Sequence, residues 1–315
     1  MSSVLLADIG GSKSRFALAN SAGRPERILV VENDTVPHLE AAVARYLDET
    51  GARPHAATLA VAGPIDGEEV ALTNRAWRFR RGEFARRFGL SQLRVVNDFE
   101  AIAWALPRLG AAETRPLGKP TVARDGVKLV LGPGTGLGVA ALLPTGGRWQ
   151  VLASEGGHAS FGPQATDEVE LFTRLQKVCG GRVSAENVLS GPGLVRLAHA
   201  LDPRAEFHES EIIVASALAR EPSAQAATRL FVRLLGRFAG GLALTFKALG
   251  GVYITGGVAG GLGPLLDEPQ FRAAFEAHPP YQPLLQAIPT LLVTCEEPGL
   301  IGCAVLADTM ADASA

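Results

Sequence analysis

The chain has 315 residues, of which 47% are hydrophobic and 20% are charged, and its formal net charge is −2. This length allows about two domains with sizeable cores. The composition is that of a globular protein and excludes a largely disordered one. Because the sequence has no basic run and no charged tail, nucleic acid and anionic membranes are poor candidate partners.

The cysteines and the N-terminus point to the same compartment. Cys179, Cys295 and Cys303 are scattered without CxxC spacing, which argues against a disulfide framework or a zinc cluster and fits a reducing environment. The short apolar run at 4–7 stops at Asp8, so we expect no signal peptide. The sequence contains no uncharged apolar stretch of about 18 residues that would span a membrane. We therefore predict a soluble cytoplasmic protein.

The first third of the chain predicts strands alternating with helices. Residues 36–50 carry apolar side chains at helical spacing, namely Leu39, Ala42, Val43, Tyr46 and Leu47. Further helices are expected at 82–88 and 99–106. Apolar or alternating runs bounded by turns predict strands at 4–7, 15–19, 28–31, 57–62, 70–72 and 93–96.

The pattern begins again after a proline-containing loop. Strands are expected at 127–131, 139–143 and 149–152, and residues 165–248 are mainly helical, with a long helix at about 224–249. The chain then predicts a strand at 252–255, a helical stretch, a strand at 291–294 and a final helix at 299–310.

The order strand, glycine-rich hairpin, strand, turn, strand occurs twice, offset by 124 residues. Residues 134–136 fall on 10–12, and 140–142 fall on 16–18. A repeat of this length predicts two related lobes with a cleft between them.

Two glycine turns occupy equivalent positions in this repeat: Gly10, Gly11 and Ser12, then Gly134, Thr135 and Gly136. The backbone N–H groups of such a turn can cradle phosphate oxygens, and the two hydroxyl groups add donors. Neither turn is a P-loop or a dinucleotide fingerprint, because the Gly-Lys-Ser/Thr order is absent and a hairpin, not a helix, follows. Plain hairpin turns remain the alternative.

Polar residues end two of the expected strands. Asp8 precedes the first glycine turn, where a carboxylate could hold Mg²⁺ beside nucleotide phosphates, or could simply form the turn. Asn97 and Asp98 lie where a strand opens into a helix, a place where chemistry often occurs. Asn and Asp are also preferred helix caps, so capping is the alternative function of this pair.

Three further groups are candidate contacts. Glu155 and His158 flank two glycines that would allow a sharp bend, and a carboxylate with an imidazole can recognise sugar hydroxyl groups. Gly256 and Gly257 close a strand, where flat backbone could face an adenine ring. Glu186 would by itself be an ordinary surface residue.

Taken together, these residues resemble the bacterial glucokinases of the hexokinase-like, actin-fold ATPase superfamily. Each block is short, but their order and spacing cover almost the whole chain. The blocks are Asp8-Ile9-Gly10-Gly11-Ser12, Ala62-Gly63-Pro64, Thr73-Asn74, Asn97-Asp98-Phe99, Gly134-Thr135-Gly136-Leu137-Gly138, Glu155-Gly156-Gly157-His158, Leu189-Ser190-Gly191-Pro192-Gly193 and Thr255-Gly256-Gly257.

The resemblance implies an ATP-dependent kinase that phosphorylates the 6-hydroxyl of glucose, with Asp98 as the general base. It implies hexose contacts from Asn97, Asp98, Glu155, His158 and Glu186. It also implies ATP phosphate contacts at both glycine turns, nucleotide contacts at Gly256 and Gly257, and Mg²⁺ held near Asp8.

The implied architecture is a two-lobed α/β actin-like, ribonuclease H-like ATPase fold. We expect residues 1–109 and 299–315 to form the small lobe, with the final helix returning to it. Residues 110–298 would form the larger lobe, and the resemblance suggests a homodimer whose interface lies in the helix-rich insert at 165–248.

The sequence departs from the family at the first turn, which usually reads Gly-Gly-Thr-Asn and here reads Gly-Gly-Ser12-Lys13. No cysteine cluster follows His158, which separates the chain from the related ROK sugar kinases and repressors. Two alternatives stay open. One is a kinase of another hexose or amino sugar, such as glucosamine, mannose or N-acetylmannosamine. The other is a non-catalytic sugar sensor, although the early first strand leaves no room for a DNA-binding helix-turn-helix.

Overall fold

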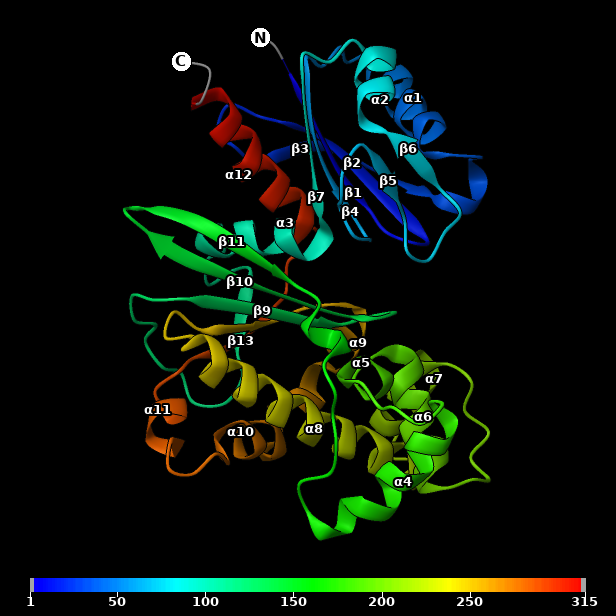
Figure 1. The fold of residues 1–315 in the computed structure, drawn as a ribbon, viewed down its shortest axis with the longest axis vertical. Coiled ribbons are helices and arrows are strands. Elements are labelled where there is room, and N and C mark those ends of the chain that lie inside the picture. Colours follow the sequence, from blue (N-terminus) through cyan, green and yellow to red (C-terminus); the bar gives the residue numbers. More distant parts are fainter. Residues whose placement is uncertain (1–2, 313–315) are drawn as a thin grey trace. The chain divides into compact units, whose positions relative to one another are not determined.

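The computed structural model describes residues 3–312, and side chains as far as residue 309. It is a mixed α/β structure that divides into two compact units, as the ribbon shows (Figure 1). Unit 1 contains the described residues up to Leu109 together with those from Cys295 onward, and unit 2 is Gly110–Thr294. The chain thus returns to unit 1 slightly before the predicted position at 299.

Unit 1 is built on a five-stranded sheet with the strand order β3-β2-β1-β4-β7. Its first three strands form antiparallel hairpins, and β4 and β7 run parallel to β1. The elements are β1 (Val4–Ile9), β2 (Lys13–Ala19), β3 (Pro25–Glu32), η1 (Asn33–Thr35), α1 (Leu39–Thr50), β4 (Ala56–Val61), β5 (Glu69–Ala71), β6 (Arg78–Arg80), α2 (Arg81–Phe88), β7 (Gln92–Asn97), α3 (Asp98–Ala105), η2 (Leu106–Arg108) and α12 (Pro298–Asp312).

Helices cover both faces of this sheet. On one face, Leu5, Ala7 and Phe16 pack with residues of α1 and α2. On the other face, Leu6 and Ala60 pack with α3 and α12. Helix α12 contacts α3 so closely that a Cβ at Gly302 would overlap the carbonyl oxygen of Ala101, so only glycine allows this approach.

Unit 2 is built on a six-stranded sheet with the order β11-β10-β9-β12-β13-β8. Its core packs the sheet against a helical layer that contains α8 and α10 (Figure 1). The elements are β8 (Thr114–Pro116), β9 (Lys128–Pro133), β10 (Leu137–Thr145), β11 (Arg148–Ser154), η3 (Gly156–His158), η4 (Thr166–Glu168), α4 (Val169–Val178), α5 (Ala185–Val188), α6 (Gly191–Leu201), α7 (Ser210–Leu218), α8 (Pro222–Phe246), β12 (Val252–Ile254), α9 (Gly257–Leu262), η5 (Gly263–Asp267), α10 (Pro269–Glu276), α11 (Gln282–Gln286) and β13 (Thr290–Val293).

The predicted repeat is present in the topology, because β9, β10, β11, β12 and β13 are connected as β1, β2, β3, β4 and β7 are. The constant offset of 124 is wrong beyond the glycine turn. In unit 1 Ile9 pairs with Ser14, whereas in unit 2 Pro133 pairs with Leu137, so the second loop is one residue shorter. When the first strands are aligned, Phe16 is therefore matched by Val139 rather than by Ala140.

The sequence analysis did not predict two short strands, β6 and β8. Strand β6 pairs with β5 in a separate two-stranded sheet, and β8 adds an edge to the sheet of unit 2. Both have three residues that include arginine, Arg-Phe-Arg in β6 and Thr-Arg-Pro in β8, so neither forms an apolar run. None of the described helices is long and apolar enough to cross a membrane.

Candidate active site

The first glycine turn connects β1 and β2, and its carbonyl groups are held by side chains from elsewhere in unit 1. The side-chain nitrogen Nδ2 of Asn33 donates to the carbonyl oxygens of Gly10 at 2.9 Å and Gly11 at 3.1 Å. Arg75 donates to the Gly11 oxygen as well, at 3.1 Å. The backbone N–H of Asn33 donates to the Ser12 oxygen at 2.8 Å. Three successive carbonyl groups thus point toward one side.

The orientation of these carbonyl groups also determines where the N–H groups of the turn point. In a trans peptide the C=O of one residue and the N–H of the next point in opposite directions. The N–H groups of Gly11, Ser12 and Lys13 therefore point away from Asn33. Successive outward N–H groups form an anion-binding concavity, and the exposed Ser12 hydroxyl lies in the same segment. This geometry suits a phosphate group.

Asp8 is the second-last residue of β1, before Ile9, and lies against the start of α12. A Cβ built on Gly299 would be 2.7 Å from Asp8 Oδ2, so the carboxylate touches the helix backbone there. Burial raises the pKa of Asp8, nearby Arg15 opposes that shift, and Glu297 adds to it. Among the described residues no group of three or more His, Cys, Asp or Glu side chains forms a metal cluster.

Asn97 and Asp98 lie at the carboxyl end of the sheet, as predicted. Ile9, Val61 and Asn97 are paired across three parallel strands, so these strands end together at one edge. Ligands commonly bind at this edge of parallel α/β sheets. Both residues are partly exposed there.

The side chain of Asn97 caps α3. Its Oδ1 accepts from the N–H groups of Phe99 at 2.9 Å and Glu100 at 3.4 Å, and its Nδ2 donates to the Gly63 oxygen at 3.1 Å. Capping, the alternative function of this pair, is therefore confirmed for Asn97, and it uses the amide oxygen. An Asn97 contact to a sugar stays a prediction, and its donor would be the second hydrogen of Nδ2.

Asp98 is the first residue of α3, and its Oδ1 lies 2.9 Å from the N–H of Phe99. A carboxylate at a helix N-terminus is stabilised by the helix dipole, which favours the ionised form that a general base requires. The catalytic function of Asp98 stays a prediction.

The second glycine turn is held differently, by residues of the segment around α5 in unit 2. The Leu137 N–H that follows the turn donates to Glu186 Oε2 at 2.9 Å. The Gly134 carbonyl accepts from the Gly191 N–H at 2.7 Å, and the Gly134 N–H donates to the Gly136 oxygen at 2.8 Å. A Cβ at Gly136 would lie 2.5 Å from Glu186 Oε2, so a larger residue there would displace this carboxylate.

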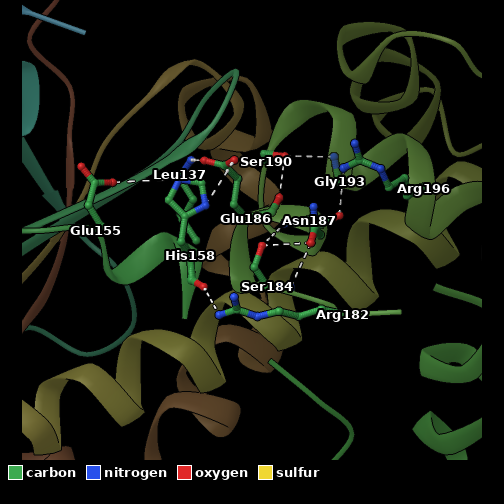
Figure 2. A network of polar contacts seen from close by, with 10 residues as sticks. All are labelled: Leu137, Glu155, His158, Arg182, Ser184, Glu186, Asn187, Ser190, Gly193 and Arg196. Carbon is green, nitrogen blue, oxygen red and sulfur yellow. Dashed lines mark hydrogen bonds and ion pairs between the residues drawn. The ribbon is translucent and has the colours of Figure 1, made fainter. Parts of the chain in front are cut away.

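The structure brings Glu155, His158 and Glu186 together, as Figure 2 shows. His158 Nε2 lies 4.0 Å from a Glu155 oxygen, and His158 Nδ1 lies 3.9 Å from Glu186 Oε1. The side chains are 75%, 61% and 31% exposed for Glu155, His158 and Glu186, so a solute can reach all three. Glu186 is therefore no ordinary surface residue, since one oxygen holds the turn and the other faces the imidazole.

Local structure explains this convergence. A bridge between Ser160 and Ser184 aligns the segment after His158 with the segment before Glu186. A capping box formed by Ser184 and Asn187 then starts the short helix that carries Glu186 (Figure 2).

The chain bends at η3 as expected, where the His158 N–H donates to the Glu155 carbonyl oxygen at 2.9 Å, and the glycines also allow close packing. Neither Gly156 nor Gly157 has a positive φ. A Cβ at Gly157 would instead overlap the carbonyl oxygen of Leu137, so only glycine lets η3 lie directly on the start of β10. This packing positions His158 beside the second turn.

Gly256 and Gly257 lie next to the same turn. Gly256 has φ 93°, and its Cβ would be 2.5 Å from the carbonyl oxygen of Pro133, the residue that precedes Gly134. Gly257 begins α9 and is exposed. Two of the predicted nucleotide elements therefore adjoin each other within unit 2, and contact with a nucleotide stays a prediction.

Sequence reasoning missed two residues that support the first turn, Asn33 and Arg75. Asn33 is completely buried although it follows a mostly exposed strand, and no motif marks it. Arg75 belongs to the block around Thr73-Asn74 that carried the resemblance, so its neighbourhood was the available signal.

Comparison with known proteins identifies the family. A family model described as Glucokinase matches residues 5–310. A curated protein named Glucokinase from Mesorhizobium japonicum is 40% identical over 96% of this chain and 91% of its own length. The bifunctional protein glk of Burkholderia orbicola is 41% identical over 98% of this chain, which spans 49% of that relative.

The fold agrees with these relatives. The crystal structure of a glucokinase from an Antarctic psychrotroph aligns with a TM-score of 0.87 and 33% identity, over 98% of this chain and 99% of that one. A likeness of this extent covers both α/β units and their repeated topology. The chain belongs to the glucokinase family.

Proposed function

We propose that this protein is an ATP-dependent kinase that transfers the γ-phosphoryl group of ATP to the 6-hydroxyl of glucose. The match to the glucokinase family over residues 5–310 carries this proposal. The cluster of Glu155, His158 and Glu186 supports it, because two carboxylates and an imidazole can accept from and donate to several sugar hydroxyl groups.

In this proposal the two glycine turns bind the phosphates of ATP. The first presents the N–H groups of Gly11, Ser12 and Lys13 on one side. The second presents Gly134, Thr135 and Gly136 beside the Glu186 carboxylate. Phosphoryl transfer depends mainly on positioning and on stabilising charge, and such turns do both. Gly256 and Gly257 would contact the nucleotide next to the second turn.

Asp98 would accept the proton of the 6-hydroxyl as its oxygen attacks phosphorus. Asp98 lies at the N-terminus of α3, where the helix dipole favours negative charge, and Asn97 would help to orient the sugar beside it. The proton leaves the hydroxyl oxygen for Asp98, and the bond from the γ-phosphorus to the bridging oxygen breaks to release ADP.

The residues present fit a Mg²⁺ ion that accompanies ATP. Mg²⁺ commonly binds one or two protein carboxylates together with substrate phosphates, and it keeps several waters. Asp8 offers one carboxylate at the end of β1, directly before the first turn, and Glu297 is its acidic neighbour. When bound, the ion would offset phosphate charge. Asp8→Asn should raise the Mg²⁺ concentration needed for half-maximal rate, and an unchanged requirement would remove Asp8 from the proposal.

A coupled assay of ADP release over a panel of hexoses tests the function. We expect glucose to give the highest kcat/KM, and glucosamine, mannose and N-acetylmannosamine to give much lower values. A higher kcat/KM for one of these sugars would reassign the substrate. ADP release with none of them, from a protein that still binds glucose, would favour a non-catalytic sensor.

We further infer a homodimer that uses the helix-rich insert. Large apolar side chains are exposed on α4 and α7: Val169, Val178, Ile212 and Leu218. Light scattering coupled to size exclusion should give twice the chain mass, and Val178→Glu should shift that mass toward the monomer. A monomeric wild-type protein would contradict this inference.

A further inference from the structure

The first glycine turn is held by a buried side chain, that of Asn33. Asn33 follows β3, and its side chain lies in the interior of unit 1 with no exposed surface. Its Nδ2 contacts two turn carbonyls, at 2.9 Å on Gly10 and 3.1 Å on Gly11. A buried amide that uses its hydrogens on one short segment fixes that segment's conformation.

Asn33 is itself held in one orientation. Its Oδ1 accepts from the hydroxyl of Ser14 at 2.7 Å, and Ser14 is also completely buried. The two turn carbonyls can only accept a hydrogen bond, whereas the Ser14 hydroxyl can also donate one, so the amide oxygen is assigned to the Ser14 side. The Nδ2 hydrogens must therefore face the glycine turn.

Arg75 contacts the same turn from the surface. Its guanidinium donates to the Gly11 oxygen at 3.1 Å and to Asp34 at 2.6 Å, and it lies over the Trp77 ring at 4.6 Å. The Gly11 carbonyl thus accepts from one buried and one partly exposed donor. The carbonyl of Gly10 has only Asn33 as a side-chain donor among the described residues.

We propose that Asn33 is a positioning residue for phosphoryl transfer: it holds the carbonyls of Gly10 and Gly11 so that the next N–H groups face the phosphates of ATP. This inference rests on the proposed function. Preorganised N–H donors stabilise charge without reorganising during the reaction. A turn free to rotate these peptides would present carbonyl oxygens to the phosphates instead, and these repel anions.

Asn33→Asp tests the proposal with little change in volume. The variant can still accept from Ser14, but a carboxylate oxygen replaces the amide donor that faces the two carbonyls. We expect KM for ATP to rise and kcat to fall, together lowering kcat/KM for ATP by about 10- to 100-fold, since small misplacements of a binding group have effects of this size. KM for glucose should stay within about twofold, because that site lies elsewhere in the proposal.

Tyr46→Phe is the matched control. Tyr46 is buried in the same unit, and its hydroxyl donates to the Arg27 carbonyl, near the other end of β3. This variant loses one buried hydrogen bond without touching the turn, so stability should fall while both KM values stay unchanged. If Asn33→Asp merely lowers the melting temperature, as the control does, or weakens glucose and ATP equally, the positioning function is wrong.

A second variant covers the case in which Asn33→Asp does not fold. Arg75→Met removes the outer donor to Gly11 and keeps Asn33, so the fold should survive and kcat/KM for ATP should fall by about 3- to 10-fold, the range expected for one hydrogen bond. An unchanged value would show that removing a donor from the Gly11 carbonyl does not affect ATP use, and would overturn the Gly11 part of the proposal. If the wild-type protein phosphorylates no sugar, the proposed function fails, and calorimetry with ADP on the same variants still tests the turn.

Discussion

The two glycine turns occupy equivalent places in two repeated sheets, yet different chemistry holds each of them. In unit 1 the fully buried amide of Asn33 fixes the turn through its carbonyl groups. In unit 2 the carboxylate of Glu186, 31% exposed, fixes the turn through the N–H of Leu137. A buried neutral brace acts whether or not a ligand is present. A carboxylate that also faces His158 can respond to what binds there, so the two units share a topology but support their turns with different residues.

This difference assigns separate tasks to the units. In the proposed function, unit 1 would supply the general base and a turn held by a buried amide, and unit 2 would supply sugar recognition next to the other turn. Variants in unit 1 should therefore change turnover or nucleotide use, whereas variants around Glu186 should change sugar and nucleotide binding together. Four measurements on variants of the two units follow from this comparison.

The largest effect is expected for Asp98→Ala. Loss of a general base typically lowers the rate by about 10²- to 10⁴-fold, and kcat should fall within that range. Because the cluster of Glu155, His158 and Glu186 lies in unit 2, the dissociation constant of glucose measured by calorimetry should change far less. Near-normal turnover would remove Asp98 from the base function.

Glu186→Ala tests whether sugar and nucleotide binding are coupled in unit 2. In the wild-type protein, glucose should tighten the binding of a non-hydrolysable ATP analogue, because sugar contacts would order the carboxylate that holds the second turn. Coupling between sites is commonly about 5- to 150-fold, and Glu186→Ala should abolish it as well as weaken glucose binding. Glu155→Gln is the companion variant, since Glu155 contacts His158 but not the turn, and it should keep the coupling. Coupling that survives Glu186→Ala would contradict the shared function of this carboxylate.

Smaller effects are expected for two glycines that allow close backbone contacts, Gly157 in unit 2 and Gly302 in unit 1. Gly157→Ala would push η3 off β10, and Gly302→Ala would push α12 off α3, so each should lower the free energy of unfolding by about 1–3 kcal/mol. The first should mainly raise KM for glucose by displacing His158, and the second should mainly lower kcat by moving the helix that begins with Asp98.

Gly162→Ala is the control for both variants, because a Cβ there meets no atom within 4 Å. Its unfolding transition in denaturant should match that of the wild-type protein. Identical kinetic changes in Gly157→Ala and Gly302→Ala would contradict the division of tasks.

The smallest effect concerns alkaline stability of unit 1. Burial raises the pKa of Tyr46 from 10.0 to about 12. A raised folded-state pKa means that the tyrosine favours folding below pH 10, and this contribution is lost as the pH rises through 12. Phenylalanine has no such titration, so the free energy of unfolding of Tyr46→Phe should fall less than that of the wild-type protein over this interval. Equal pH slopes in denaturant titrations would refute the burial effect.

The sequence by itself determined the order of the elements, the two glycine turns, the strand end at Asn97 and Asp98, and the family. These features are local: apolar periodicity, glycine spacing and polar residues at strand ends are all visible within short windows. The residues that support each turn are seen only in the tertiary structure. Asn33 reaches Gly10 from the end of another strand, and Glu186 reaches Leu137 from a helix about fifty residues away.

The structure also shows what several residues do that the sequence analysis had singled out. Gly157 allows a close approach of η3 to β10 as well as the bend, and Asn97 uses its side-chain oxygen as a helix cap. The second hairpin is one residue shorter than the first, which no overlay with a fixed offset can show. Contacts between distant segments depend on how sheets and helices pack, and a single sequence carries no local signal for them.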